Sequence, residues 1–283
     1  MKSLKNISVR SIWYVLIPVT LVFLMKIFVI DVYRVSSNSM NETLEVGDIV
    51  VIDKLSKGPL FYTKSNKSLN PFLSKLFDRN YSNSFDSFKR LVALNKEFKR
   101  NEIVVFNNPL YLPELMIKRI IAIPGDSLKI TDSNISVNNM VYAPSHLRNK
   151  NYVSKAISKD EQLIQLLTVD AKEGGRFSIY PEDISFLNRK LSEQKVFIPK
   201  RGVTIELTTT NFNLYKRIIN DYEKRNFINV EGEIFEKGKR VCRYTFKENY
   251  YYVLGDNINN SADSRAKGFI PEFNIIGKTI LIL

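Results

Sequence analysis

The chain has 283 residues, 44% of them hydrophobic, which is enough for one large core or two modest ones. Its net charge of +13 at pH 7 favours an anionic partner, either nucleic acid or an acidic lipid surface. The basic residues are spread along the chain, and no zinc-finger or aromatic RNA-binding motif is present. We therefore expect membrane lipid and no nucleic acid as a partner.

The single histidine and single cysteine exclude an intrachain disulfide and any metal site with two histidines. His146 lies in a polar stretch that suggests no catalytic role, so a hydrolase built on this chain is expected to use another base. Cys242 is expected to be a small buried hydrophobic residue. Neither a metal nor a cofactor is expected.

An apolar run from Ile12 to Ile30 is close to the roughly 20 residues that cross a bilayer. Lys2, Lys5 and Arg10 precede it without any acidic residue, which places the N-terminus in the cytoplasm and the remainder outside. A cleaved secretory signal is the alternative, although the run is long for one and no A-x-A site follows it directly. We expect residues 1–31 to be a cytoplasmic N-terminus and a retained transmembrane helix.

Mostly short strands are predicted for the rest of the chain, separated by turn residues. The expected strands are 33–40, 48–53, 102–106, 116–123, 127–130, 134–137, 140–142, 203–207, 250–254 and 275–283. Helices are expected at 158–168 and 211–225, the second capped by Thr210 or Asn211. Residues 59–100 are basic and aromatic, which fits either a second core or contact with a membrane surface.

Ser37 and Ser39 alternate soon after the apolar run. In a strand, residues two apart face the same side. Ser39 could then attack a carbonyl while the Ser37 hydroxyl and the Ser39 backbone N–H bind the oxygen that becomes negative. A solvated polar strand edge is the alternative explanation.

Lys118 lies in a strongly apolar predicted strand, with Met116 and Ile120 on its face and Arg119 on the other. A free lysine has a pKa of about 10.4, and burial lowers that pKa because it disfavours the charged amine. A general base with a pKa of roughly 7 to 8 requires about 3.4 kcal/mol of such destabilisation. A lysine at a strand edge with its amine in water is the alternative.

The stretch from Gly255 to Gly268 is rich in Gly, Asn, Asp and Ser, which form turns whose side chains bind the backbone. A serine here could hydrogen-bond a neutral lysine and orient its lone pair. Asp263 and Arg265 could pair and hold the shape of the loop. An ordinary surface loop is the alternative.

These three stretches, in this order after an apolar segment, resemble those of the bacterial type I signal peptidases, which are membrane-bound Ser/Lys proteases. The family boxes S-x-S-M-x-P-T-L, I-K-R-x-x-x-x-P-G-D and G-D-N-x-x-x-S-x-D-S-R match SNSMNETL, IKRIIAIPGD and GDNINNSADSR. Glu42 stands where the family usually has proline, Ile258 replaces a common arginine, and Asn101-Glu102 replaces Gly-Asp. These departures concern the rigidity of the loops around the site.

The resemblance implies that Ser39 is the nucleophile and Lys118 its general base. It implies that Ser37 supplies the oxyanion-hole hydroxyl, together with the Ser39 N–H, and that Ser261 orients the lysine. The residues implied to support the loop are Asp256, Asn257, Asp263 and Arg265. The residues expected to line two shallow substrate pockets are Val35, Met40, Leu44 and Ile117.

The implied activity is removal of signal peptides from exported preproteins by a monomeric enzyme at the outer face of the cytoplasmic (inner) membrane. The expected fold is mostly β: a transmembrane helix, an antiparallel β catalytic domain (32–126 plus 250–283) and an inserted β-rich domain with helices (127–249). A self-cleaving repressor is disfavoured by the apolar segment. A silent, membrane-tethered binding protein is disfavoured because all three implied catalytic side chains are present.

Overall fold

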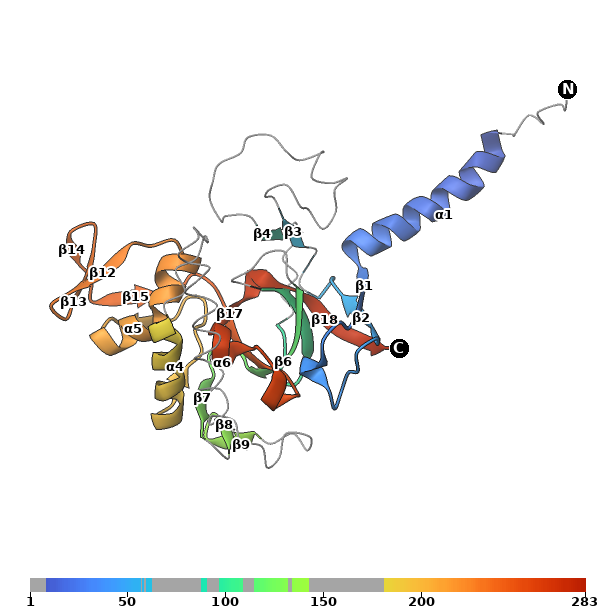
Figure 1. Cartoon of the computed structure of the whole chain (residues 1–283). Coiled ribbons are helices and arrows are strands. Elements are labelled where there is room, and N and C mark those ends of the chain that lie inside the picture. The colour runs from blue at the N-terminus through green and yellow to red at the C-terminus, as the bar shows by residue number, and fades with distance from the viewer. Residues whose placement is uncertain are drawn as a thin grey trace, which may run out of the picture.

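The computed structural model describes residues 9–56, 58, 60–62, 88–90, 97–108, 115–131, 134–142 and 181–283. Helix α1 (Val9–Phe28) projects from the body of the protein, and β1 (Ile30–Arg34) follows it almost directly (Figure 1). Among the residues described, no helix combines the length and hydropathy that crossing a membrane requires.

Short strands dominate the rest of the described residues, in agreement with the mostly β class predicted. The remaining strands are β2 (Ile49–Asp53), β3 (Leu60–Tyr62), β4 (Phe88–Arg90), β5 (Ile103–Asn107), β6 (Leu115–Ala122), β7 (Ser127–Ile130), β8 (Ile135–Val137), β9 (Met140–Tyr142), β10 (Val196–Phe197), β11 (Thr204–Glu206), β12 (Phe227–Val230), β13 (Glu233–Glu236), β14 (Lys239–Arg240), β15 (Arg243–Thr245), β16 (Tyr250–Leu254), β17 (Ile270–Pro271) and β18 (Ile275–Ile282). The other helical elements are α4 (Pro181–Glu193), α5 (Thr209–Arg217), α6 (Ser264–Lys267), the 3-10 turns η1 (Asn38–Met40), η4 (Ile258–Asn260) and η5 (Glu272–Asn274), and the π turn η3 (Ile218–Tyr222).

The main sheet has seven strands in the order β1-β2-β18-β5-β6-β16-β17, paired antiparallel and curled (Figure 1). Strands from both ends of the chain meet in it, because β18 lies between β2 and β5. Strand β6 lies between β5 and β16, both of which are buried along their whole length. The lysine on β6 is therefore placed in the interior of the sheet.

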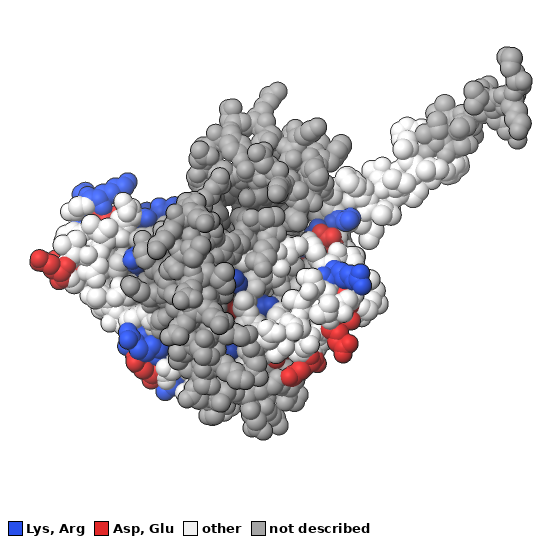
Figure 2. All heavy atoms as spheres, in the orientation of Figure 1, with Lys and Arg blue, Asp and Glu red and all other residues white. Residues whose placement is uncertain are grey.

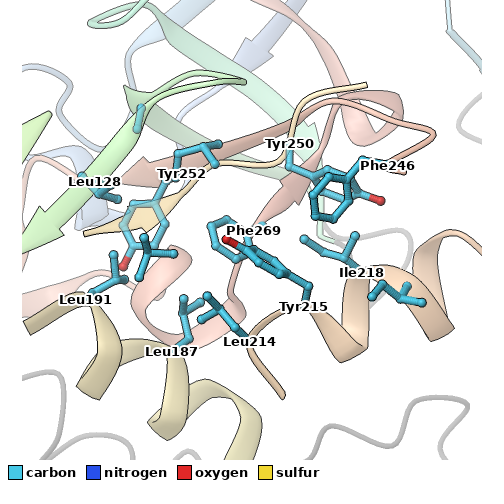
Figure 3. Close-up of a cluster of buried hydrophobic side chains, with 14 of the residues drawn as sticks. Leu128, Leu187, Leu191, Leu214, Tyr215, Ile218, Phe246, Tyr250, Tyr252 and Phe269 are labelled. Atoms are coloured by element: carbon cyan, nitrogen blue, oxygen red, sulfur yellow. The ribbon is translucent and has the colours of Figure 1, made fainter. Parts of the chain in front are cut away.

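The described residues between β6 and β16 form three smaller sheets: β10-β7-β8-β9, β11-β15 and β12-β13-β14. Its largest core includes Leu187 and Leu191 of α4 and Tyr215 of α5, which pack towards Tyr250 and Tyr252 of β16 (Figure 3). Strand β16 therefore shares its core with this segment while its end leads into the loop after Leu254. The division into two domains stays a prediction.

Helix α5 differs from the predicted helix 211–225. Thr208, not Thr210 or Asn211, is the N-cap, and its hydroxyl accepts a hydrogen bond from the Asn211 N–H at 3.1 Å. The first threonine of the run takes this role because its backbone is extended. The helix then gives way to the π turn η3.

Helix α4 and strands β12, β13 and β14 are absent from the predicted elements. The turns between these strands place Glu231-Gly232 and Lys237-Gly238 at positive φ. Such turns favour Asn or Asp before glycine, so Glu and Lys there gave no hairpin signal.

Cys242 is exposed, so the prediction that it is buried is wrong. It lies in the connection between β14 and β15, and connections run over the surface. The predicted helix 158–168, His146 and most of residues 59–100 lie outside the described residues.

Candidate active site

Ser39 lies in the 3-10 turn η1, so the predicted strand from Tyr33 to Met40 is wrong: β1 ends at Arg34. The chain turns at Asn38, whose carbonyl accepts a hydrogen bond from the Asn41 N–H at 3.1 Å. Even so, the Ser37 and Ser39 hydroxyl oxygens lie 3.2 Å apart. The two serines meet across the start of a tight turn and not along a strand face.

The Lys118 amine meets Ser39 at hydrogen-bond distance. Nζ lies 2.6 Å from Ser39 Oγ and also donates to the Ile117 carbonyl at 2.9 Å. Lys118 is 2% exposed and Ser39 7%, which excludes a lysine with its amine in water. Met116 and Ile120, which were predicted to share its face, are buried in one core cluster.

The backbone N–H of Ser39 donates no hydrogen bond to any residue that the structure describes. This N–H and the Ser37 hydroxyl are the two groups that the sequence assigned to an oxyanion hole. Both belong to the turn that presents Ser39 Oγ to Lys118. This short turn therefore carries the Ser37 hydroxyl, the Ser39 hydroxyl that contacts the Lys118 amine, and the Ser39 N–H.

The loop after β16 is bound to this turn. Asn257 donates its N–H to the Ser39 carbonyl at 3.1 Å and its side-chain amide to the Asn38 carbonyl at 3.0 Å. Asn260 donates to Asn38 Oδ1 at 3.0 Å. Asn38 and Asn260 were not predicted to matter, because their spacing carries no signal until the loop and the turn are brought together.

Gly255 is a third residue of the site that was not predicted from the sequence. A Cβ at this position would lie 2.1 Å from Ser261 Oγ and 2.5 Å from the Ser39 carbonyl oxygen. Only glycine allows Ser261 and Ser39 to approach the end of β16 this closely. The available signal was a glycine directly after a fully buried strand.

The Ser261 hydroxyl makes no hydrogen bond to Lys118 in the structure. Its Oγ is buried and has no hydrogen-bond partner among the described residues. The structure thus brings Ser261 to the Ser39 backbone without showing the lysine contact that was predicted for it.

Asp263 and Arg265 form a buried pair next to this serine. Arg265 Nε and Nη2 donate to the two Asp263 carboxylate oxygens at 2.9 and 2.8 Å. Arg265 also binds the Ile258 carbonyl, and Asp263 accepts the Gly255 N–H. Burial raises the pKa of Asp263, but Arg265 outweighs it, with help from the Gly255 N–H and Lys118, so this pKa lies below its ordinary value.

A second buried pair links three segments of the site. Arg119 Nε and Nη2 bind the two carboxylate oxygens of Asp256 at 2.9 and 2.6 Å. Thr43 donates to Asp256 at 2.6 Å, and Arg119 Nη1 donates to the Asn101 carbonyl at 2.9 Å. The segment that carries Ser39, strand β6 and the loop after β16 are therefore joined behind Lys118.

The three departures from the family boxes have structural explanations. Asn101 has a φ of 70°, a left-handed conformation that asparagine tolerates better than most residues, so it can stand in for glycine. Ile258 is 3% exposed and belongs to the largest core. Glu42 has a φ of 96°, which proline cannot adopt, so the turn after Ser39 differs from one built on proline.

The four predicted pocket residues lie together. Val35, Met40 and Leu44 are buried in one cluster, and Ile117 packs against it. Met40 follows Ser39, and Ile117 precedes Lys118, so the cluster borders the Ser–Lys contact. No group of three or more possible metal ligands was found in the described part of the chain.

The described residues thus place a serine hydroxyl and a buried lysine amine at hydrogen-bond distance beside a curled antiparallel sheet. The family model described as "Signal peptidase, peptidase S26" matches residues 8–283. The chain therefore belongs to the signal peptidase family S26 and is a peptidase, as the resemblance implied.

Several relatives carry the name "Signal peptidase I". That of Buchnera aphidicola subsp. Baizongia pistaciae is 27% identical over 93% of this chain and 72% of its own length. Those of Haemophilus influenzae and Aquifex aeolicus are 24% and 23% identical, over 94% and 90% of this chain and 67% and 76% of theirs. A solved signal peptidase I from Enterococcus faecalis V583 is 18% identical, with a TM-score of 0.28, over 65% of this chain and 97% of that one.

Proposed function

We propose that the chain is a membrane-anchored endopeptidase that removes signal peptides with Ser39 as nucleophile and Lys118 as general base. The contact of 2.6 Å between Lys118 Nζ and Ser39 Oγ, buried between two segments 79 positions apart, carries this proposal. Membership of the signal peptidase family supports the substrate class.

In the acylation step, neutral Lys118 accepts the Ser39 proton as Oγ attacks the carbonyl carbon of the last signal residue. The carbonyl oxygen becomes negative and is bound by the Ser39 N–H and the Ser37 hydroxyl. The resulting ammonium donates its proton to the leaving amine of the mature protein. The signal peptide then remains on Ser39 as an ester.

In the deacylation step, Lys118 accepts a proton from a water molecule that attacks this ester. The same oxyanion donors act again, and Ser39 recovers its proton as the signal peptide leaves with a free carboxylate. The buried Ser261 hydroxyl, which lies beside the Ser39 backbone, turns to Lys118 and directs its lone pair. Arg265 offsets part of the charge of Asp263, which would otherwise favour the ammonium form of Lys118 more strongly.

The substrate lies extended beside Val35–Met40 and the start of β6, so its alternate side chains face the cluster formed by Val35, Met40, Leu44 and Ile117. Small side chains at the last and third-last signal positions suit this closely packed border. Larger ones would require these buried residues to move.

Helix α1 serves as the membrane anchor, with the catalytic domain at the outer face. Its large apolar side chains are exposed all round, for example Trp13 at 57%, Leu16 at 47% and Val22 at 66%. In Figure 2 the described part of α1 shows an uncharged surface, and charged side chains gather where it meets the body. An exposed apolar surface of this kind is typical of contact with a membrane or a partner, and it supports the proposed anchor.

The test compares the purified protein in detergent with its Ser39→Ala variant on a preprotein that carries an A-x-A site, read by mass spectrometry. We expect one cut after that site, absent in the variant. Ser192→Ala, which changes a serine on α4, is the matched control and should cut normally. Cutting by Ser39→Ala at the same site would contradict the proposal.

A further inference from the structure

Helix α1 joins the main sheet without a flexible linker. Only Val29 separates Phe28, the last residue of α1, from β1, which pairs with β2 along its whole length. Ser39 follows five positions after the end of β1 at Arg34. The direction in which α1 leaves the sheet therefore determines where Ser39 lies relative to the surroundings of α1 (Figure 1).

Lys54, directly after β2, bridges this junction. Its backbone N–H donates to the Val29 carbonyl at 2.9 Å. Its Nζ donates at 3.0 Å to the carbonyl of Lys26, which belongs to the last turn of α1, where carbonyls have no partner within the helix. The same Nζ pairs with Asp31 Oδ2 of β1 at 2.6 Å. One residue thus binds the end of the helix and the start of the strand.

The ion pair between Lys54 and Asp31 is largely buried and is held by further hydrogen bonds. The side chains of Lys54 and Asp31 are 12% and 16% exposed, so the pair is only weakly screened by solvent. Asp31 also accepts the Tyr33 hydroxyl at 3.0 Å and the Val32 N–H at 2.9 Å. A cation at the C-terminal end of a helix is in addition favoured by the helix dipole.

We propose that Lys54 and Asp31 are positioning residues, which fix the direction of α1 and so hold Ser39 and Lys118 at a set height above the membrane surface. This inference rests on the proposed function. A substrate held in the bilayer by its own apolar segment can place its cleavage site only a short distance above the membrane. The distance between Ser39 and the membrane surface therefore determines whether the cleavage site reaches the serine. A freely diffusing peptide has no such requirement.

The experiment uses the full chain in lipid vesicles and two substrates that share one cleavage sequence. One is a preprotein whose apolar segment is embedded in the vesicle, and the other is a short soluble peptide. For Lys54→Met we expect preprotein cleavage to fall about tenfold, because misplacement by an ångström is costly, while peptide cleavage keeps the wild-type rate. Lys54→Arg, which keeps the charge and the donors, should restore preprotein cleavage.

Lys190→Met is the matched control, since it removes an ion pair with Glu193 on α4, and both substrates should be cut at the wild-type rate. An equal fall for both substrates in Lys54→Met would show a general structural role and overturn the inference, as would no change for either. Asp31→Asn keeps the bond from Lys54 to the helix and should give a smaller loss on the preprotein alone. Failure of the wild-type protein to cut either substrate would instead overturn the proposed function.

Discussion

Ser261 Oγ lies in the space into which a side chain at Gly255 would project. A Cβ there would be 2.1 Å from that oxygen and 2.5 Å from the Ser39 carbonyl oxygen. The absence of one carbon atom thus lets the loop serine and the backbone of the proposed nucleophile meet at the end of β16. The Asn257 N–H donates a hydrogen bond to the same Ser39 carbonyl. The close approach at Gly255 and this hydrogen bond together hold Ser39 next to Lys118.

Gly255→Ala should reduce signal-peptide cleavage by about a hundredfold or more, because the Ser39 turn must move away from Lys118. The measurement is kcat and KM on an A-x-A preprotein, and the loss should fall mainly on kcat. Gly202→Ala is the control: nothing lies within 4 Å of its Cβ, although its φ of +81° makes alanine strained. It should lower the melting temperature and leave kcat unchanged. A fully active Gly255→Ala enzyme would show that the turn does not need this approach.

Arg119→Met should destabilise the fold by about 3 to 5 kcal/mol, because it leaves the Asp256 carboxylate buried without its partner. Asp256 is 0% exposed, and the hydrogen bond from the Thr43 hydroxyl does not replace the positive charge of the guanidinium. Arg201→Met is the comparison, since its pair with Glu248 has side chains 60% and 33% exposed and should be worth at most about 1 kcal/mol. Urea denaturation measures both. Equal losses in the two variants would contradict a buried, connecting role for Arg119.

The strand that carries Lys118 could be predicted from the sequence because its apolar pattern is local, and β6 differs from the prediction by one residue at each end. The turn around Ser39 could not, since it is bound by Asn257 and Asn260, more than 200 positions away. The meeting of Ser39 and Lys118 was expected only from the family boxes. At Glu42 the family boxes are misleading. They suggest that a proline has been replaced, but the positive φ of this residue excludes proline at this position.

Asp126 should make the stability of the protein depend on acid pH. Burial raises the pKa of its carboxyl, but the Arg100 guanidinium, the Ile123 N–H and the Asn138 amide lower it more, so the pKa lies below its ordinary 3.8. A carboxyl group whose pKa is lower in the folded state stabilises the folded protein at pH values above its unfolded-state pKa. This stabilisation is lost as the pH falls through the pKa of the folded state.

Unfolding free energies of the wild type and Asp126→Asn, measured from pH 7 to pH 3, test this dependence. Their difference should be constant above about pH 4.5 and shrink below the ordinary carboxyl pKa. Glu233→Gln is the control, because its ion pair with Arg240 has side chains 46% and 61% exposed and should give no comparable slope. A constant difference down to pH 3 would show that the Arg100 contact does not depress the pKa of Asp126.

Glu42→Gly should stabilise the protein by up to about 1 kcal/mol, because glycine adopts a φ of 96° without the steric cost that glutamate bears. Glu42→Pro should destabilise it by about 3 kcal/mol or more, although the family usually has proline here, since the ring fixes φ near −65°. Melting temperatures of the three proteins give the order Gly above Glu above Pro. In the wild type, the Thr43 N–H donates a hydrogen bond to the Met40 carbonyl at 3.1 Å. The proline variant would lose this hydrogen bond, because the turn must change its form. Glu42→Pro should therefore also lower cleavage by displacing Ser39, whereas a proline variant as stable and active as the wild type would mean that the turn can adopt the other form at little cost.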